Sequence, residues 1–171
     1  HPEAPGAPFW LDKGTILFST IKHYVMQLLR KRGYSEVMTP LIMTRNLWER
    51  SGHWDHYKNN MFHIELEERE YAVKPMNCPG AVMMYKERQW SYKDLPQRWA
   101  ELGIVHRYEK SGTMHGLFRV RHITQDDAHI FCTLEQLVDE VVAMIDLVYE
   151  IYNQFGLTDL SVELSTRPKD R

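Results

Sequence analysis

Residues 105–121 read VHRYEKSGTMHGLFRVR, and this stretch decides more about the fold than any other part of the chain. Charged residues occupy alternate positions on both sides of a loop, 110–116, that contains glycine and serine. They are Arg107, Glu109, Arg119 and Arg121. Because side chains on one face of a strand repeat every two residues, the pattern predicts two long paired strands, 98–109 and 117–132, with these charges on one face.

Such a charged face has two interpretations. It binds a charged ligand, or it is a solvated surface on which exposed ion pairs contribute little to stability. The pattern alone leaves both interpretations open.

The sequence before this stretch predicts mixed structure. Apolar residues at helical spacing and a basic end followed by Gly33 indicate a helix over 14–32. A strand is expected over 34–43, and Pro40 within it favours the edge of a sheet because proline cannot donate to the ladder. The following expected elements are a short helix over 44–51 capped by Thr44, a loop at 52–55, strands at 61–65 and 70–74, and a helix over 79–87.

After the two long strands, Thr133 is expected to cap a long amphipathic helix, and 160–165 to form a final strand. Several strands follow one another directly, without a helix between them. This order predicts an α+β fold, an antiparallel sheet flanked by helices, rather than a doubly wound parallel sheet. A glycine-rich phosphate loop is absent from the sequence, so a bound nucleotide would be held by side chains.

Composition excludes several classes of protein. The 171 residues are 43% hydrophobic and 26% charged, as in globular proteins, and no apolar run approaches the roughly 20 residues of a membrane helix. A net charge of −2 gives no general attraction to DNA. The two cysteines form no closely spaced framework, which favours a reducing, cytoplasmic location, with Cys132 as a structural thiol. Residues 1–8 are proline-rich and are expected to be a linker or a cut in a longer chain, with the domain at 9–171.

Several strings in the chain narrow the choice of family. They are KPMNCPG at 74–80, HGL at 115–117, TQDDAHIF at 124–131 and LSTRP at 164–168. In order and spacing they resemble threonyl-tRNA synthetases, and the arginine and glutamate arrangement resembles motif 2 of class II aminoacyl-tRNA synthetases. The helix at 14–32 and the Pro40 strand resemble motif 1, which builds the homodimer interface in that class.

The resemblance implies an ATP site. Arg107 would be catalytic and hold the α-phosphate beside the threonine carboxylate, because a planar guanidinium can neutralise charge that develops during the displacement. Glu109 would contact the adenine edge and Arg119 the γ-phosphate, with Mg²⁺ neutralising the remaining charge. At the position where the family commonly stacks an aromatic ring on adenine, this chain has Ile123.

The resemblance also implies a zinc site that selects threonine. Taken singly, Cys78 and His129 would be read as a buried cysteine and a core histidine, and their spacing has no metal signature. In the family, the equivalent residues bind Zn²⁺ with a further histidine outside this chain, which leaves a position open for substrate. Asp127 would accept the hydroxyl proton of threonine, and Met76 and Gln125 would line the pocket.

Taken alone, His53 would be read as a structural histidine of a glycine-bearing loop. The resemblance implies that it lies near the terminal ribose of tRNA(Thr) and assists transfer of the threonyl group.

The implied partners are ATP, L-threonine, the tRNA acceptor end and a second copy of the parent enzyme. The third class motif and the anticodon-binding domain are expected outside these residues, so we expect the chain alone to be nearly inactive. The alternatives are a non-catalytic synthetase-like regulator, a class II enzyme for serine or proline, and a simple interaction protein.

Overall fold

The computed structural model describes residues 1–166, so the last residues of the LSTRP string lie outside the described part. The chain divides into two compact units, His1–Thr133 and Leu134–Arg171. The first unit holds both sheets and all the site residues expected from the sequence. None of the helices in the described part combines the length and the apolar character needed to cross a lipid bilayer.

A mixed sheet of three strands forms one layer of the first unit. Its order is β1 (Ser35–Glu36), β5 (Gln97–His106) and β6 (His122–Phe131). The long strands β5 and β6 pair antiparallel along their whole length, and the short edge strand β1 pairs parallel to β5. The antiparallel pairing at the centre confirms the predicted α+β class.

A second, antiparallel sheet has the order β2 (Ile42–Thr44), β4 (Arg69–Val73) and β3 (Phe62–Leu66). Glu67 and Glu68 connect β3 to β4, and both have positive φ angles, 50° and 59°. Two consecutive residues of this conformation make a tight turn whose twist matches that of the flanking strands. The hairpin is therefore fixed locally, and its strands lie within one residue of those expected at 61–65 and 70–74.

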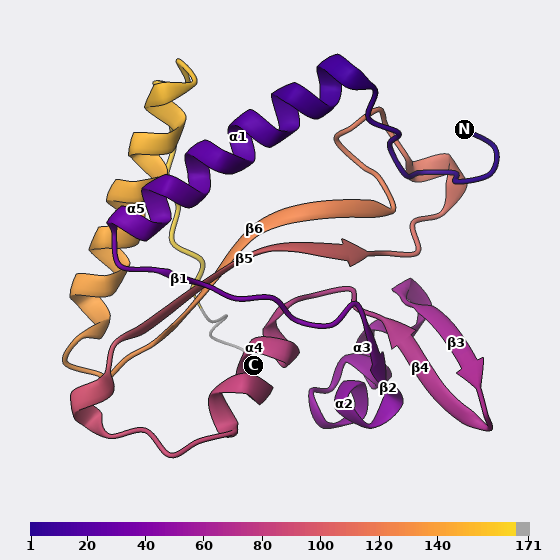
Figure 1. Cartoon of the computed structure of the whole chain (residues 1–171), viewed down its shortest axis with the longest axis horizontal. Helices are drawn as coiled ribbons and strands as arrows, with labels where there is room; N and C mark the ends of the chain where they lie inside the picture. The colour runs from indigo at the N-terminus through magenta and orange to yellow at the C-terminus, as the bar shows by residue number, and fades with distance from the viewer. Residues whose placement is uncertain (167–171) are drawn as a thin grey trace. The chain divides into compact units, whose positions relative to one another are not determined.

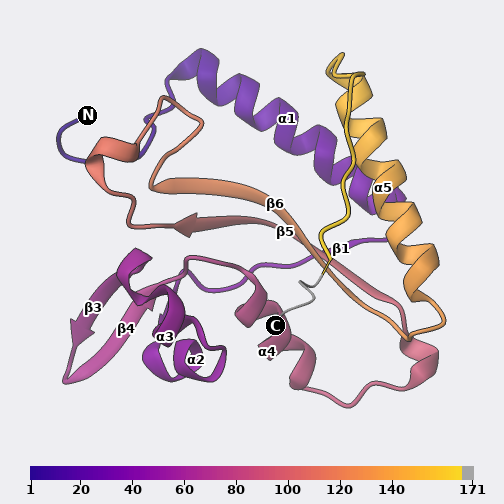
Figure 2. The ribbon, with the colours of Figure 1, turned by 180° about the vertical axis from the view of Figure 1, so that it is seen from behind.

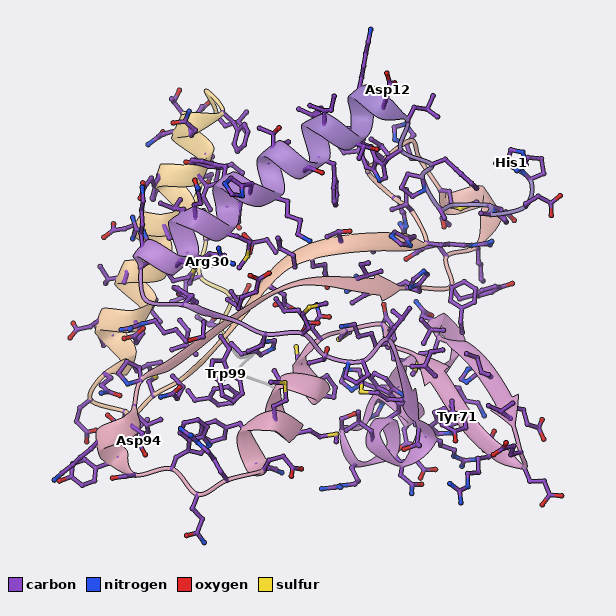
Figure 3. The ribbon with its side chains drawn as sticks, viewed as in Figure 1. His1, Asp12, Arg30, Tyr71, Asp94 and Trp99 are labelled. Carbon is purple, nitrogen blue, oxygen red and sulfur yellow. The ribbon has the colours of Figure 1, made fainter. Side chains whose placement is uncertain are left out.

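The helices are α1 (Asp12–Lys31), α2 (Arg45–Arg50), α3 (His53–Tyr57), α4 (Cys78–Lys86) and α5 (Leu137–Gln154), with 3-10 turns η1 (Lys58–Asn60), η2 (Tyr92–Asp94) and η3 (Ser111–Thr113). Figures 1 and 2 show α1 on one side of β5 and β6, and α2 to α4 with the second sheet on the other side. Trp99 points from β5 toward α4 and contacts the ring of Tyr85 there (Figure 3). The site residues lie on this second side of β5 and β6.

The predicted strand at 34–43 is wrong as a single element. The chain makes β1, leaves the first sheet, and enters the second sheet as β2. The break falls at Thr39 and Pro40, because Pro40 has no N–H and the N–H of Thr39 donates to the Glu101 carboxylate instead of a neighbouring strand. Both resulting strands lie at sheet edges, as proline predicted.

The predicted long strands at 98–109 and 117–132 end early on the loop side. The N–H of Glu109 donates to the carbonyl of Arg107, and the N–H of Arg121 donates to the carbonyl of Gly6. Neither group is then available to continue the ladder between β5 and β6, which ends at the pair His106 and His122.

Four further local predictions fail. The loop expected at 52–55 contains the start of α3, and α5 begins at Leu137 with Gln136, not Thr133, at its N-cap. Thr44 occupies the N-cap of α2, but its side chain makes no capping bond. Residues 160–165 are not a strand, since a strand needs a hydrogen-bonded neighbour and no described segment pairs with them.

A buried ion pair joins the two sheets. Nζ of Lys74, which follows β4, lies 2.8 Å from Oε1 of Glu101 in β5, and the two residues are only 2% and 4% exposed. Oγ1 of Thr39 accepts from Lys74 at 2.7 Å and donates to Glu101 at 3.0 Å. Three segments that are distant in sequence therefore share one hydrogen-bonded centre.

Removing one partner of this pair should be strongly destabilising, because the other charge would stay buried. Lys74→Met is expected to lower the free energy of unfolding by about 3–5 kcal/mol. The double change Lys74→Met with Glu101→Leu should cost less than the single change, since it leaves no unpaired charge. Urea unfolding of the variants measures both, and Lys13→Met on the exposed face of α1 is the control. A cost at Lys74 no greater than at Lys13 would show that the pair does not hold the sheets together.

Candidate functional site

Three side chains of types that can bind a metal ion meet between α4 and β6. The Sγ of Cys78, a carboxylate oxygen of Asp127 and a ring nitrogen of His129 all lie within 4.8 Å of one another. Cys78 is the first residue of α4, and the other two alternate on β6 and so share a face. The structure thus brings together two residues expected as metal ligands and one expected at the threonine hydroxyl.

The donor set fits a zinc ion. Thiolate sulfur and imidazole nitrogen are the ligands that zinc prefers, and a carboxylate is also common. Cys78 and His129 would hold the ion, and Asp127 lies close enough either to join them or to face the substrate. Loss of hydration, and then the negative charge of Asp127, raise the pKa of the Cys78 thiol. Loss of hydration and Asp127 also raise the pKa of Asp126.

The register between β5 and β6 determines which other side chains lie beside these three residues. Asp127 pairs with Glu101, and Gln125 pairs with Gly103, so Gln125 lies on the same face as the metal-binding cluster. Asn77, just before α4, donates from Nδ2 to Oδ2 of Asp127 at 3.0 Å. Asn77 is completely buried and its Oδ1 has no hydrogen-bond partner among the described residues.

His53 and Met76 meet although they lie far apart in sequence. Nε2 of His53 is 3.1 Å from Sδ of Met76, and Nδ1 is 2.9 Å from Oγ of Ser51. His53 and Cys78 also line one hollow of about 230 Å³. The residue expected at the tRNA ribose and the residue expected at the metal therefore open onto the same space.

A second hollow, of about 360 Å³, lies beyond the end of β5 and β6. Its lining includes all the residues expected to bind ATP, which are Arg107, Glu109, Arg119 and Ile123. The carboxylate of Glu109 accepts from Nε of Arg119 at 3.0 Å. Nε of Arg107 donates to the carbonyl of Pro75 at 3.2 Å, which fixes this arginine beside the loop that leads to Cys78.

Arg121 departs from the charged face predicted for it. Its Nε donates to the backbone carbonyl of Glu109 at 2.8 Å, and its guanidinium lies over the ring of Tyr108. The carbonyl of Gly6 accepts from the N–H of Arg121 at 2.7 Å. Arg121 therefore anchors the loop and the N-terminal segment, which explains why an arginine in phase with Arg119 need not bind ligand.

Sequence reasoning missed several residues of the site. Phe118 lines the second hollow, and Arg50 and Lys86 line the first. Asn77 stood within a quoted string but received no role. The signal for Phe118 was available, because it is an aromatic residue next to Arg119, whereas that for Asn77 depends on its distant partner Asp127.

The fold is that of a class II synthetase core. A family model described as the tRNA synthetase class II core domain (G, H, P, S and T) matches residues 61–170, and the chain belongs to this family. Among curated relatives, the threonine–tRNA ligase of Thermotoga petrophila is 56% identical over 167 residues, which are 98% of this chain and 26% of that protein. The chain thus spans about a quarter of the length of the curated relatives that it matches.

Solved structures of synthetases are similar to this chain. The crystal structure of the RNA binding domain of threonyl-tRNA synthetase from Cryptosporidium parvum Iowa II has a TM-score of 0.87 and 46% identity, over 90% of this chain and 38% of that one. The prolyl-tRNA synthetase of Giardia lamblia in complex with prolyl-adenylate has a TM-score of 0.79 over 88% of this chain and 32% of that one. At 22% identity it shows the shared fold alone.

The paired histidines at the ends of the strands give a pH prediction. Nε2 of His106 lies 3.1 Å from Nδ1 of His122, and desolvation, followed by the charge of His122, lowers the pKa of His106. As the pH falls from about 7 to about 5, the unfolded chain therefore takes up this proton before the folded chain does, and stability falls. His106→Phe should make this decline shallower, as measured by urea midpoints across that range. An equal slope in the variant would contradict the prediction.

Proposed function

We propose that this chain supplies most of the active site of an enzyme that activates L-threonine with ATP and transfers it to tRNA(Thr). The observation that carries the proposal is the juxtaposition of Cys78, Asp127 and His129 on the sheet face that leads to the hollow lined by Arg107, Glu109 and Arg119. An amino acid and a nucleotide bound in these places would meet at Arg107.

Arg107 is the proposed catalytic residue. The threonine carboxylate attacks the α-phosphate of ATP, and pyrophosphate leaves with the electrons of the broken bond. The guanidinium neutralises charge that accumulates on the phosphoryl oxygens during this exchange. Its bond to the carbonyl of Pro75 supports this role, because it holds the group in place before substrate binds.

Glu109 would accept a hydrogen bond from the adenine edge, and Arg119 would bind the γ-phosphate beside Mg²⁺. Both lie in one hollow with Ile123, which would pack on the adenine ring. Phe118 lines the same hollow and would offer an aromatic surface to the ring.

Cys78 and His129 would hold a zinc ion, and the ion would supply Lewis-acid chemistry for the amine and hydroxyl of threonine. Asp127 would accept the hydroxyl proton, and Met76 and Gln125 would bound the pocket. A site built to engage a hydroxyl can reject an analogue without it by about 10⁴–10⁵-fold, whereas a hydrophobic pocket separates valine from threonine far less. Serine carries the hydroxyl and would be discriminated poorly.

His53 would assist transfer to the terminal ribose of tRNA(Thr). Its position between Met76 and Ser51, on the hollow that also contains Cys78, supports the assignment. The loop that contains η3 would meet the acceptor end.

The parent enzyme is proposed to be a cytoplasmic homodimer that does not bind DNA. Exposed Ile16, Leu17 and Ile21 on α1 support a partner surface on this helix, because they leave an apolar stripe in contact with water. Both cysteines are free thiols, which accords with a reducing compartment.

The deciding experiment is threonine-dependent ATP–pyrophosphate exchange by the full-length protein, with valine and serine compared and zinc assayed. Exchange with threonine, weaker exchange with serine, none with valine and about one zinc per chain are expected. Folded, zinc-loaded protein that is silent with all three amino acids would instead indicate a non-catalytic regulator.

Arg107→Ala in the full-length protein should raise the free-energy barrier of threonine activation by about 2–4 kcal/mol, because it removes a preorganised charge. Single-turnover formation of the adenylate measures this directly. Arg69→Ala, an exposed arginine of β4, is the control and should leave the rate unchanged. An unaltered rate in Arg107→Ala would remove this residue from the mechanism.

A further inference from the structure

We propose that Asn77 is a positioning residue for Asp127, and that Gly103, which has no side chain, leaves the space in which the Asn77 amide lies. The inference rests on the proposed function, since it concerns how the hydroxyl of threonine is recognised. It adds two residues, on the α4 side and on β5, to the set that determines amino-acid specificity.

The hydrogen bond has only one chemical assignment. Nδ2 of Asn77 lies 3.0 Å from Oδ2 of Asp127. An ionised carboxylate can only accept, so the amide group must present its nitrogen, and the orientation of the Asn77 side chain is determined by Asp127. The charge on the acceptor also makes this bond stronger than a bond between neutral groups.

Gly103 holds the amide in that orientation. An ideal Cβ on Gly103 would lie 2.3 Å from Oδ1 of Asn77 and 2.5 Å from both Cγ and Nδ2. The three nearly equal distances place the amide plane flat against the backbone of β5. Gly103 has no positive φ, so the need for space, not for an unusual backbone conformation, explains a glycine here.

A structural role at the helix end does not account for Asn77. Asparagine is a favoured N-cap residue, but its side chain makes no capping bond to α4. The backbone carbonyl of Asn77 accepts from the N–H groups of Gly80 and Ala81, and any residue supplies that carbonyl. The buried side chain is used for Asp127 instead.

As a consequence, one carboxylate oxygen of Asp127 is engaged by Asn77, and the plane of the carboxylate is fixed. Asp127 cannot rotate without breaking the bond to an amide that is itself trapped against Gly103. Its remaining acceptor capacity then points in a constant direction, where a threonine or serine hydroxyl can donate. Valine makes no use of this acceptor.

The test compares Asn77→Ala and Gly103→Ala in the full-length zinc-loaded enzyme. Outer-shell partners of this kind are worth about 10–100-fold in activity, so kcat/KM for threonine and for serine should fall together by about tenfold or more. The inhibition constant of valine as a competitor of threonine and the KM for ATP should change by less than about twofold, because neither depends on the hydroxyl acceptor. Gly103→Ala displaces the Asn77 amide without touching Asp127, so it should reproduce the pattern, and the double variant should be no worse than either single one.

The controls separate this role from a structural one. Asn59→Ala, an exposed asparagine of η1, should leave all values unchanged, and zinc content and thermal midpoint are measured for every variant. If Asn77→Ala does not fold, Asn77→Ser replaces it in the same comparison. Equal losses in threonine turnover, serine turnover and valine affinity, loss of zinc, or no loss at all would overturn the proposal while the wild-type enzyme remains active. A wild-type enzyme without threonine-dependent exchange would overturn the proposed function first.

Discussion

The buried pair of Lys74 and Glu101 is the constraint on which the rest of the structure depends. It lies where the two sheets meet, and Thr39 ties the chain that crosses between them to the same centre. Two charges in such a place are stable only when their hydrogen bonds are nearly complete, so the position of each partner is narrowly defined. The loop that follows Lys74 is therefore held rigidly from its first residue.

Residues 74–78 connect this buried pair to the candidate site. Each of these consecutive residues meets a different distant residue, and these are, in order, Glu101, Arg107, His53, Asp127 and His129. The proposed ATP, threonine and tRNA groups are thereby positioned by one short segment. A shift of this segment would move all three proposed binding regions together, which suits a reaction in which a misplacement of about 1 Å can cost roughly 100-fold in rate.

Local patterns predicted α1, α2, α4, α5 and the β3–β4 hairpin well, though not α3, because periodicity and turn chemistry act over a few residues. The errors fall where a distant partner takes a backbone group. The N–H of Arg121 donates to the carbonyl of Gly6, and the N–H of Thr39 donates to the carboxylate of Glu101. The roles of Cys78 and His129 came from resemblance, since sequence spacing contains no information about the fold that brings them together. Asn77 could not be assigned, because its environment is made by Gly103 on another strand.

The contacts at the centre also bear on the order of folding. Thr39 and Glu101 are separated by 62 positions, and Asn77 and Asp127 by 50, whereas the β3–β4 hairpin closes through two residues. Closing long loops costs entropy that is recovered only when their contacts form, so the hairpin and α1 can form early while the joint between the sheets forms late. Activity would then appear only with the last cooperative step of folding. Partly folded chains would hold recognisable secondary structure and no functional centre, which limits misdirected chemistry during synthesis.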